Sequence, residues 1–319
     1  MKNKLSVLAG ISALFILTAA SGQAVMCCRS SLEMCARLII PRLFPFFLLS
    51  SFLNSAGLPR MLGRVFGRWS RRLFGVSGAG FSAFFMGICG GYPLGAAAAG
   101  QMEEQDIISS AEAEKLLVFC NNTGPAFIIG AAGSGIFHSS EAGLLLYTVH
   151  IISAVLCGII CRGRCCSASD APAVPQPEIS PAKAFTEAVQ KSIVNTLNVC
   201  GFALSFGIFT GLLDVCGFLP SLCLRLSDLF SQEPAFFSAL IKGLIELCSG
   251  ISSMEGFPLR PANLALAAFL LGFGGLSVHF QTMSLFADKD ISCLPHFAGR
   301  IISASLAALL AYICFPVLL

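Results

Sequence analysis

The sequence predicts an all-helical, multi-pass membrane protein, built as an inverted repeat with broken and re-entrant helices. Composition is the first reason: 55% of the 319 residues are hydrophobic and 12% are charged, whereas soluble domains carry about 25% charge. The mean hydropathy of +0.81 agrees with this class. The second reason is a series of apolar segments of about 20 residues or more, the length that spans ~30 Å of hydrocarbon. The third is that Gly, Pro and small polar residues interrupt several of these segments.

The interruptions lie at similar places in the two halves of the chain, at residues 87–95, 121–125, 249–258 and 272–284. An ordinary membrane anchor has no reason to unwind there, because freed backbone groups cost several kcal/mol each in hydrocarbon. Broken helices at matching positions in two halves are typical of transporters, whose binding sites they form. We therefore predict one binding site near the middle of the membrane, between the repeats.

Taken in order, the apolar segments cover about 5–26, 36–56, 75–99, 116–136, 141–161, 193–218, 236–256, 262–286 and 297–318. The first resembles a signal peptide as well as a membrane helix, and we interpret residues 1–28 as an N-terminal transmembrane helix. Residues 163–184 are polar and Pro-rich, which is typical of a linker. This linker separates a first repeat, 29–162, from a second repeat, 185–319. The repeats share a pattern of segments rather than residue identity.

Lysine and arginine predict the orientation, because cytoplasmic loops are enriched in them. The N-terminal lysines, the arginine cluster within 60–72 and the basic residues at the ends of the linker should all lie inside. Three apolar segments separate the cluster from the linker, so one of them must enter and leave on the same side. We predict that 75–99 is re-entrant from the cytoplasm and that 236–256 is re-entrant from outside. The two halves then have opposite topology.

Several classes of function are not expected. The net charge is only +3, and no basic patch interleaved with aromatic residues points to a nucleic-acid partner. No P-loop, zinc motif or nucleophile elbow is present, so we expect no enzymatic activity, no catalytic residue and no cofactor. A lone His279 lacks the converging ligands that a metal site needs. The acidic stretch 103–114 is interpreted as a capped, solvated connector rather than an ion-binding element.

Asn121, Asn122 and Thr123, followed by Gly124 and Pro125, form the sharpest local signal. Proline removes a helical donor and restricts the residue before it. The two amides and the hydroxyl then supply donors and acceptors in mid-segment, where each would cost on the order of 2–7 kcal/mol if left unpaired. Two interpretations remain open: the side chains line a solute site, or they hold helices together by interhelical hydrogen bonds.

Three further residues are candidates for solute contact. Tyr92 lies in a Gly-Gly-Tyr-Pro turn, which is either a contact with solute or a tight packing turn. Glu246 lies in an apolar run, and a carboxylate within the membrane indicates function by default. It either recognises a solute, a coupling proton or a cation, or it pairs with Lys242 four residues earlier. Gln281 lies beside His279 in the second half's counterpart of the Asn-Asn-Thr segment, where we expect a polar cavity.

Several motifs together resemble one family. They are Phe-Pro-Phe-Phe (44–47), Gly-Gly-Tyr-Pro-Leu-Gly (90–95), Phe-Cys-Asn-Asn-Thr-Gly-Pro-Ala-Phe-Ile (119–128) and Gly-Ser-Gly-Ile-Phe (133–137). They are similar to the YlbJ family of sporulation integral membrane proteins, in the nucleoside recognition, or Gate, domain group. The resemblance implies a multi-pass protein of the bacterial cell membrane, a role in spore cortex formation and distant kinship with concentrative nucleoside transporters. By position it implies that Asn121, Asn122, Thr123 and Glu246 face the site.

We therefore predict a protein that binds or transports a small polar solute by alternating access, the candidates being a nucleoside and a cell-wall precursor component. The alternative is a non-transporting membrane scaffold for spore-envelope assembly, with partners docking on 103–114 or on the linker. The expected partners are the lipid bilayer, the solute, and further copies of the chain or other spore-envelope membrane proteins. The expected location is the cell membrane of the mother cell or of the forespore.

Overall fold

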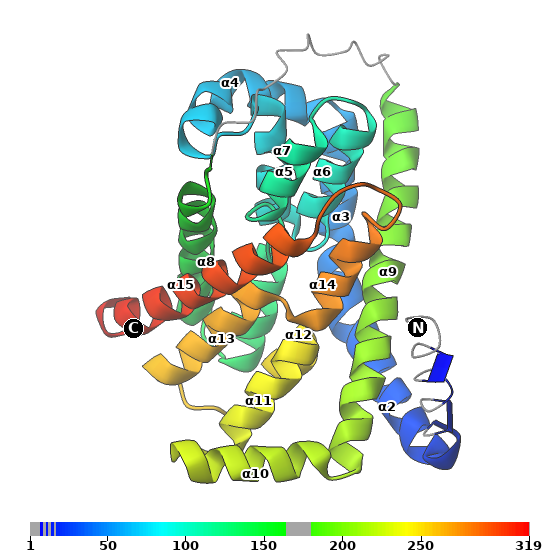
Figure 1. Cartoon of the computed structure of the whole chain (residues 1–319), viewed down its shortest axis with the longest axis vertical. Helices are drawn as coiled ribbons and strands as arrows, with labels where there is room; N and C mark the ends of the chain where they lie inside the picture. The colour runs from blue at the N-terminus through cyan, green and yellow to red at the C-terminus, as the bar shows by residue number, and fades with distance from the viewer. Residues whose placement is uncertain (1–6, 9–10, 12–13, 16, 164–179, 319) are drawn as a thin grey trace.

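The computed structural model describes residues 7–8, 11, 14–15, 17–163 and 180–318 (Figure 1). These residues form helices joined by short turns, and no strand occurs among them. The predicted all-helical class is therefore confirmed. The first helix with defined bounds is α2 (Ser21–Met34), which continues through the π-helical η1 (Cys35–Ile39) into the first repeat.

The same five units follow one another in each half: a long helix, a surface helix, a helical hairpin, a broken helix and a final helix. In the first half they are α3 (Ile40–Ser55), α4 (Leu58–Leu73), α5–α6 (Gly78–Gly90 and Leu94–Glu104), α7–η2 (Ser110–Leu117 and Ala126–Ile136) and α8 (Ser140–Ile160). In the second half they are α9 (Pro181–Val215), α10 (Phe218–Phe230), α11–α12 (Pro234–Ile245 and Leu247–Ser252), α13–α14 (Pro261–Phe273 and Gly275–Ser284) and α15 (Leu294–Leu318).

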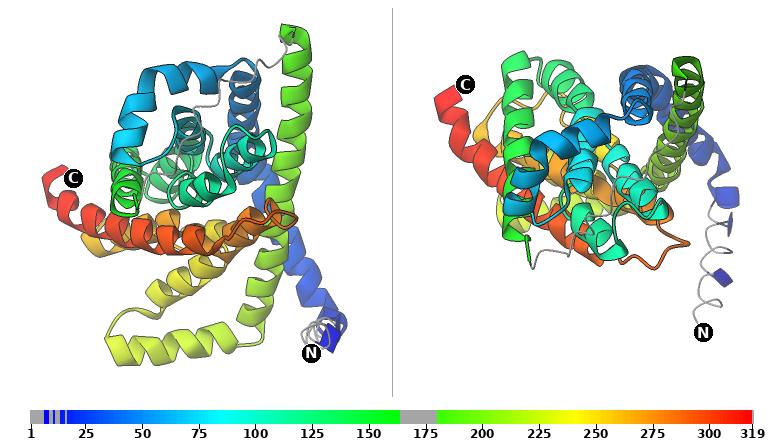
Figure 2. Two further views of the ribbon diagram at one scale, coloured as in Figure 1. Left: turned by 45° about the horizontal axis from the view of Figure 1, so that its top comes forward. Right: turned by 90° about the horizontal axis from the view of Figure 1, so that it is seen from above.

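The two halves run in opposite directions. In Figure 1, α3 ends at the top of the molecule, where α4 lies, whereas α9 starts at the top and ends at the bottom, where α10 lies. The turned view at the left of Figure 2 keeps α4 and α10 at opposite ends. α3 packs directly against α9. Both surface helices begin after a glycine in the left-handed region, Gly57 (φ 92°) and Gly217 (φ 77°). The predicted inverted repeat is thus present.

Both segments predicted to be re-entrant are helical hairpins. The arms of the first hairpin contain 13 and 11 residues, which at ~1.5 Å per residue reach roughly two thirds of a ~30 Å hydrocarbon core or less. Gly91 (φ 83°) turns the chain between them. In the second hairpin α11 ends at Ile245 and α12 returns beside it, because Gly250 packs on the backbone of Gly243. The break in this segment therefore begins at Glu246, ahead of the predicted 249–258.

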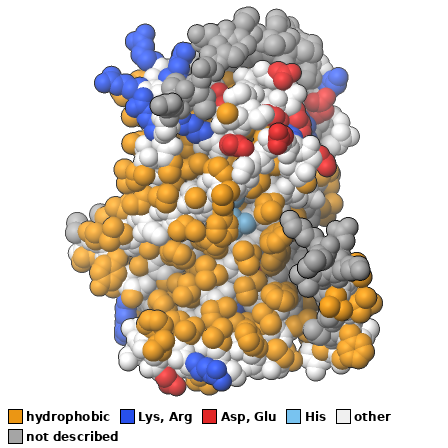
Figure 3. All heavy atoms as spheres, viewed as in Figure 1, with side chains coloured by type: hydrophobic (Ala, Val, Ile, Leu, Met, Phe, Trp, Pro, Cys, Tyr) orange, Lys and Arg blue, Asp and Glu red, His pale blue; other side chains and the backbone are white. Residues whose placement is uncertain are grey.

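Four helical segments of the described chain are long and apolar enough to cross a membrane: α8, α9, the α13–α14 pair and α15. The number rises to six if each of two bent helix pairs counts as one span. Figure 3 shows apolar side chains over the middle of the visible face, with most of its charged side chains gathered above them. These features agree with the predicted multi-pass membrane location.

The predicted segment boundaries differ from the structure at both ends of the first repeat. Part of the predicted N-terminal transmembrane helix, 1–28, lies outside the described residues, and α2 runs across its end at residue 28. Most of the predicted linker, 163–184, also lies outside them. Its last four residues are helical, because Ser180 caps α9 and Pro181 occupies the first helical position.

Candidate functional site

Each hairpin tip packs backbone-to-backbone against the break of its own repeat. A methyl group at Gly91 would lie 2.8 Å from the backbone nitrogen of Gly124, in the first break. A methyl group at Gly275, in the second break, would lie 2.8 Å from the Gly243 carbonyl oxygen and 3.0 Å from the Leu247 nitrogen. Such approaches require the absence of a side chain. The glycines therefore allow the hairpin tip and the helix break of the same repeat to lie in direct contact.

Hydrogen bonds then join the two halves across these breaks. The Thr123 hydroxyl donates to the carbonyl oxygen of Leu271 at 2.7 Å, and the side-chain amide of Asn121 donates to the Thr282 hydroxyl at 2.8 Å. The Tyr92 ring lies against Gly274, where a methyl group would be 2.9 Å from the phenol oxygen. The breaks that the sequence placed far apart thus meet at one junction between the repeats.

A cavity of about 50 Å³ opens at this junction. Its apolar walls come from η1, α3, η2 and α9 together with the hairpins. Tyr92 and Thr123 line it from the first repeat, and Glu246 and Gln281 line it from the second. Four of the six predicted site residues therefore share one cavity, which is the arrangement expected for a site between repeats.

The polar groups of this junction are incompletely paired. Four buried atoms here are without a hydrogen-bond partner: the Tyr92 hydroxyl, Gln281 Oε1, Asn121 Oδ1 and the ring nitrogen Nδ1 of His150. Leaving a buried polar group unpaired costs about 1–3 kcal/mol. Each such group in a native structure calls for an explanation. Tyr92 and Gln281 line the cavity, where water or solute can supply the missing partner.

Glu246 lies at the tip of the second hairpin rather than inside a helix. The residue is 2% exposed, and its extended backbone (φ −144°, ψ 116°) separates α11 from α12. The carboxylate accepts hydrogen bonds from the backbone N–H groups of Cys248 (3.0 Å) and Ser249 (2.6 Å), so it caps α12. Each carboxylate oxygen retains a lone pair that can face the cavity.

The predicted pairing of Glu246 with Lys242 is wrong. The Lys242 ammonium instead contacts the carboxylate of Asp214, at the end of α9, at 2.6 Å. The physical reason is the break itself: residues four apart share a face only in a continuous helix, and α11 ends before Glu246. Glu246 has no ion pair to any described lysine or arginine.

The side chains of Asn121 and Asn122 make hydrogen bonds within the protein, as the interhelical interpretation expects, and they do not line the cavity. The amide of Asn122 donates to the Phe119 carbonyl at 2.8 Å, and its oxygen accepts from Arg300 at 3.2 Å. Asn121 bridges the repeats, as described above. Residues 121–124 are not helical, so they lack the backbone hydrogen bonds of a helix. The two side-chain amides fix the position of this break instead.

Sequence reasoning missed Arg300, which is the largest fully buried side chain of the described residues. Its guanidinium donates to Asn122 Oδ1 and to the Val118 carbonyl, both at 3.2 Å, so it joins α15 to the first break. None of the described carboxylates forms an ion pair with it. The signal that could have found it is an ionisable residue within an apolar segment, the same signal that Glu246 gives.

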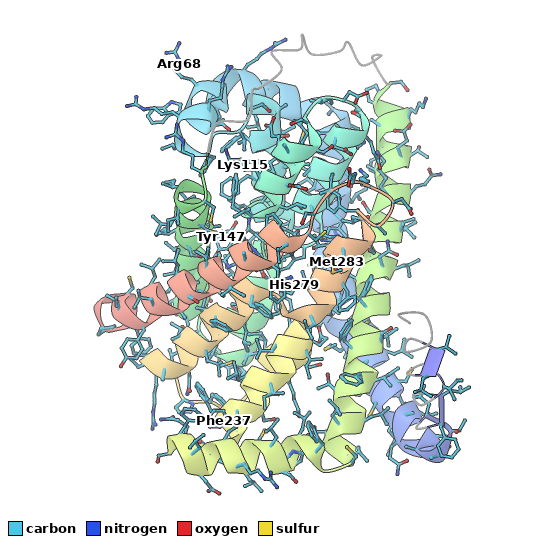
Figure 4. All side chains as sticks on the ribbon, in the orientation of Figure 1. Arg68, Lys115, Tyr147, Phe237, His279 and Met283 are labelled. Atoms are coloured by element: carbon cyan, nitrogen blue, oxygen red, sulfur yellow. The ribbon has the colours of Figure 1, made fainter. Side chains whose placement is uncertain are left out.

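Three histidines are buried around Arg300 and Asn122. His150 Nε2 accepts from the Thr123 backbone N–H at 3.2 Å, and a ring nitrogen of His296 lies 3.0 Å from the Leu117 carbonyl. The rings of His279 and His296 are 5.1 Å apart, and His279 lies at mid-height in the molecule (Figure 4). Across the described chain, no three His, Cys, Asp or Glu side chains converge as metal ligands.

Replacing Arg300 by lysine is expected to lower the free energy of unfolding by about 1–3 kcal/mol. Lysine keeps the charge but lacks the planar fork that reaches two acceptors at once, so one of the two oxygens loses its partner. Thermal unfolding in detergent measures the change. The exposed Arg260→Lys substitution is the matched control and should stay within roughly 0.5 kcal/mol. Equal melting of the two variants would contradict a bridging role for Arg300.

Comparison with known proteins gives one informative match. The chain is 28% identical over 306 residues to "Sporulation integral membrane protein YlbJ" of Bacillus subtilis (strain 168), a match that covers 88% of this chain and 74% of the relative. No family model matches, and no solved structure matches. The relative confirms the expected resemblance to the YlbJ family. The Gate-domain assignment stays a prediction.

Proposed function

We propose, with the similarity to YlbJ as the premise, that this multi-pass membrane protein binds a small polar solute between its repeats and moves it by alternating access. One observation carries the proposal: a single cavity is lined by polar side chains from both repeats, Tyr92 and Thr123 on one side and Glu246 and Gln281 on the other. Of these, the Tyr92 hydroxyl and Gln281 Oε1 have no hydrogen-bond partner. The relative is a sporulation integral membrane protein; the setting proposed for this chain is sporulation, at spore cortex formation.

The chemistry of the lining favours a solute rich in hydrogen-bond donors. The Glu246 carboxylate and Gln281 Oε1 accept hydrogen bonds, while the Tyr92 hydroxyl can donate or accept. Hydroxyl, amino or imino groups satisfy these acceptors, and both a nucleoside and the sugar of a cell-wall precursor present them. The surrounding apolar walls suit the ring faces of either solute.

The size of the cavity supports a conformational cycle. About 50 Å³ is room for a few water molecules, whereas pockets for drug-sized ligands have roughly 300–1,000 Å³. We propose that this cavity widens during the cycle to admit the solute. The two hairpins enter from opposite ends and meet the breaks through glycines, so movement of either hairpin would open the cavity toward one side.

The alternative, a scaffold for spore-envelope assembly, receives less support because the acidic stretch is engaged within the chain. Lys289 contacts the carboxylates of Glu103 at 3.4 Å and Glu104 at 3.0 Å. Glu114 accepts from the backbone of Ser292 at 2.7 Å, and Glu112 from the backbone of Ser77 at 2.5 Å. These carboxylates bind groups on neighbouring segments of the same chain. This agrees better with a connector than with a surface on which a partner docks.

A solute panel tests the proposal on the purified protein. Among nucleosides and cell-wall precursor components, one class is expected to raise the thermal unfolding temperature, with about 2.7 kcal/mol of stabilisation at a hundredfold excess over Kd. The same solute should enter proteoliposomes. Gln281→Leu should reduce the stabilisation, and the exposed Gln232→Leu should not. Stabilisation without uptake would support a sensor or scaffold; the absence of both would contradict the proposal.

A further inference from the structure

The surface helix α4 presents two exposed stripes that the site does not use. Met61, Val65 and Trp69 are 58%, 63% and 64% exposed and recur every four residues, so they form one apolar stripe along the helix. On the opposite flank the helix packs closely on the start of α5, where a methyl group at Gly63 would lie 3.2 Å from the Gly78 carbonyl carbon. The apolar stripe thus remains free in the structure.

A basic stripe runs alongside the apolar one. Arg64, Arg68 and Arg72 are exposed and share the same four-residue spacing. The 16 residues of α4 contain no Asp or Glu. Figure 4 shows Arg68 pointing away from the body of the molecule, and Figure 3 shows basic side chains above the apolar belt on this side. The side chains of Arg64, Arg68 and Arg72 therefore lie on the outer surface of the molecule.

The orientation of α4 is that expected of a helix lying in the membrane surface. The run Met61–Leu73 is bent by 94° from α5, which is one arm of the re-entrant hairpin. With α5 directed into the bilayer, α4 lies along its plane, with the apolar stripe beside the hydrocarbon and arginines at headgroup level. Basic amphipathic helices of this kind bind in the interface and respond to anionic lipid.

The counterpart helix of the second repeat lacks this charge. α10 also begins after a left-handed glycine, but it carries one arginine and one aspartate, Arg225 and Asp228. Two helices in equivalent positions thus differ in net charge, so the basic stripe does not follow from the fold.

We propose that α4 is a binding site for the headgroups of anionic phospholipids, held by Arg64, Arg68 and Arg72 while Met61, Val65 and Trp69 enter the acyl region. Guanidinium groups bind phosphate with charge-assisted hydrogen bonds, and each basic residue near an anionic surface strengthens binding about fivefold. The site is independent of solute binding.

Trp69 tests this directly, because it is the only tryptophan of the chain. The protein is reconstituted in mixed phosphatidylglycerol and phosphatidylcholine vesicles in which one lipid or the other carries brominated acyl chains. Brominated phosphatidylglycerol should quench Trp69 at least about twofold more than brominated phosphatidylcholine at the same fraction. High salt should reduce this preference, because it screens exposed charges.

The triple variant Arg64→Gln, Arg68→Gln, Arg72→Gln should quench equally with both lipids, while Arg225→Gln in α10 should keep the wild-type preference. Equal quenching of the wild type by the two lipids would overturn the proposal. So would a preference that survives in the triple variant. The salt series on wild-type protein keeps the test decisive if the variant does not fold, since a preference insensitive to salt also contradicts an electrostatic site.

Discussion

Replacing Glu246 by glutamine is expected to reduce solute uptake by about 10- to 100-fold, because hydrogen bonds to a charged group contribute roughly 1.5–3 kcal/mol. Glutamine has nearly the same shape and retains one acceptor oxygen, so it keeps part of the cap on α12. The substitution removes the carboxylate, which we propose accepts hydrogen bonds from the solute and carries a coupling proton or cation. Uptake into proteoliposomes, with the solute identified by the panel, measures the effect.

The control separates this effect from a loss of structure. Glu255→Gln changes an exposed carboxylate in the turn after α12 and should transport as the wild type does. Loss of the cap on α12 would cost about 0.5–2 kcal/mol, which a parallel unfolding measurement detects. Wild-type uptake by a folded Glu246→Gln protein would refute the site assignment while leaving the transport proposal intact.

Replacing Gly87 by alanine is expected to destabilise the protein by about 3 kcal/mol or more, at the upper end of overpacking effects. A methyl group there would coincide with the carbonyl oxygen of Cys120, which is backbone and cannot rotate away. Gly95 on the facing arm makes a similar approach to Cys120. The hairpin would have to withdraw from the first break, so solute binding should fail together with stability.

Thermal unfolding in detergent measures this substitution against Gly201→Ala. Gly201 lies inside α9 with no atom within 4 Å of an added methyl group. Alanine there should stabilise by roughly 0.5–1 kcal/mol, since glycine is unfavourable inside a helix. If the two variants unfold alike, the contact between the first hairpin and the first break is not part of the native structure in solution.

The class of fold followed from patterns that act locally. Apolar length, interruption by Gly and Pro, and the side on which basic residues lie depend on short stretches of chain. They were enough to predict two interrupted segments that form helical hairpins, one in each of two halves that run in opposite directions. Serine caps such as Ser109 on α7 were equally local. The acidic stretch 103–114 was predicted to be solvated, but Glu112 within it is 3% exposed and accepts a hydrogen bond from the Ser77 backbone.

The candidate site was predicted as a region more accurately than as a set of contacts. Tyr92, Thr123, Glu246 and Gln281 do line one cavity. The role of Asn122 was not predictable, because its partner Arg300 lies 178 residues away in the sequence. The pairing of Lys242 depended on where α11 ends, and a difference of a single residue in that boundary changes which side chains share a face.

The sequence by itself therefore determined a helical membrane protein with paired interruptions in two inverted halves, because helix length, helix breaking and charge placement are properties of neighbouring residues. Only the tertiary structure decided which polar groups make hydrogen bonds within the protein and which face the cavity. The side-chain nitrogen of Asn121 and the Asn122–Arg300 pair make hydrogen bonds across the repeats, whereas the Tyr92 hydroxyl and Gln281 Oε1 remain without partners. The physical reason is that each buried donor or acceptor must find its partner in space, and in this chain those partners come from the other repeat.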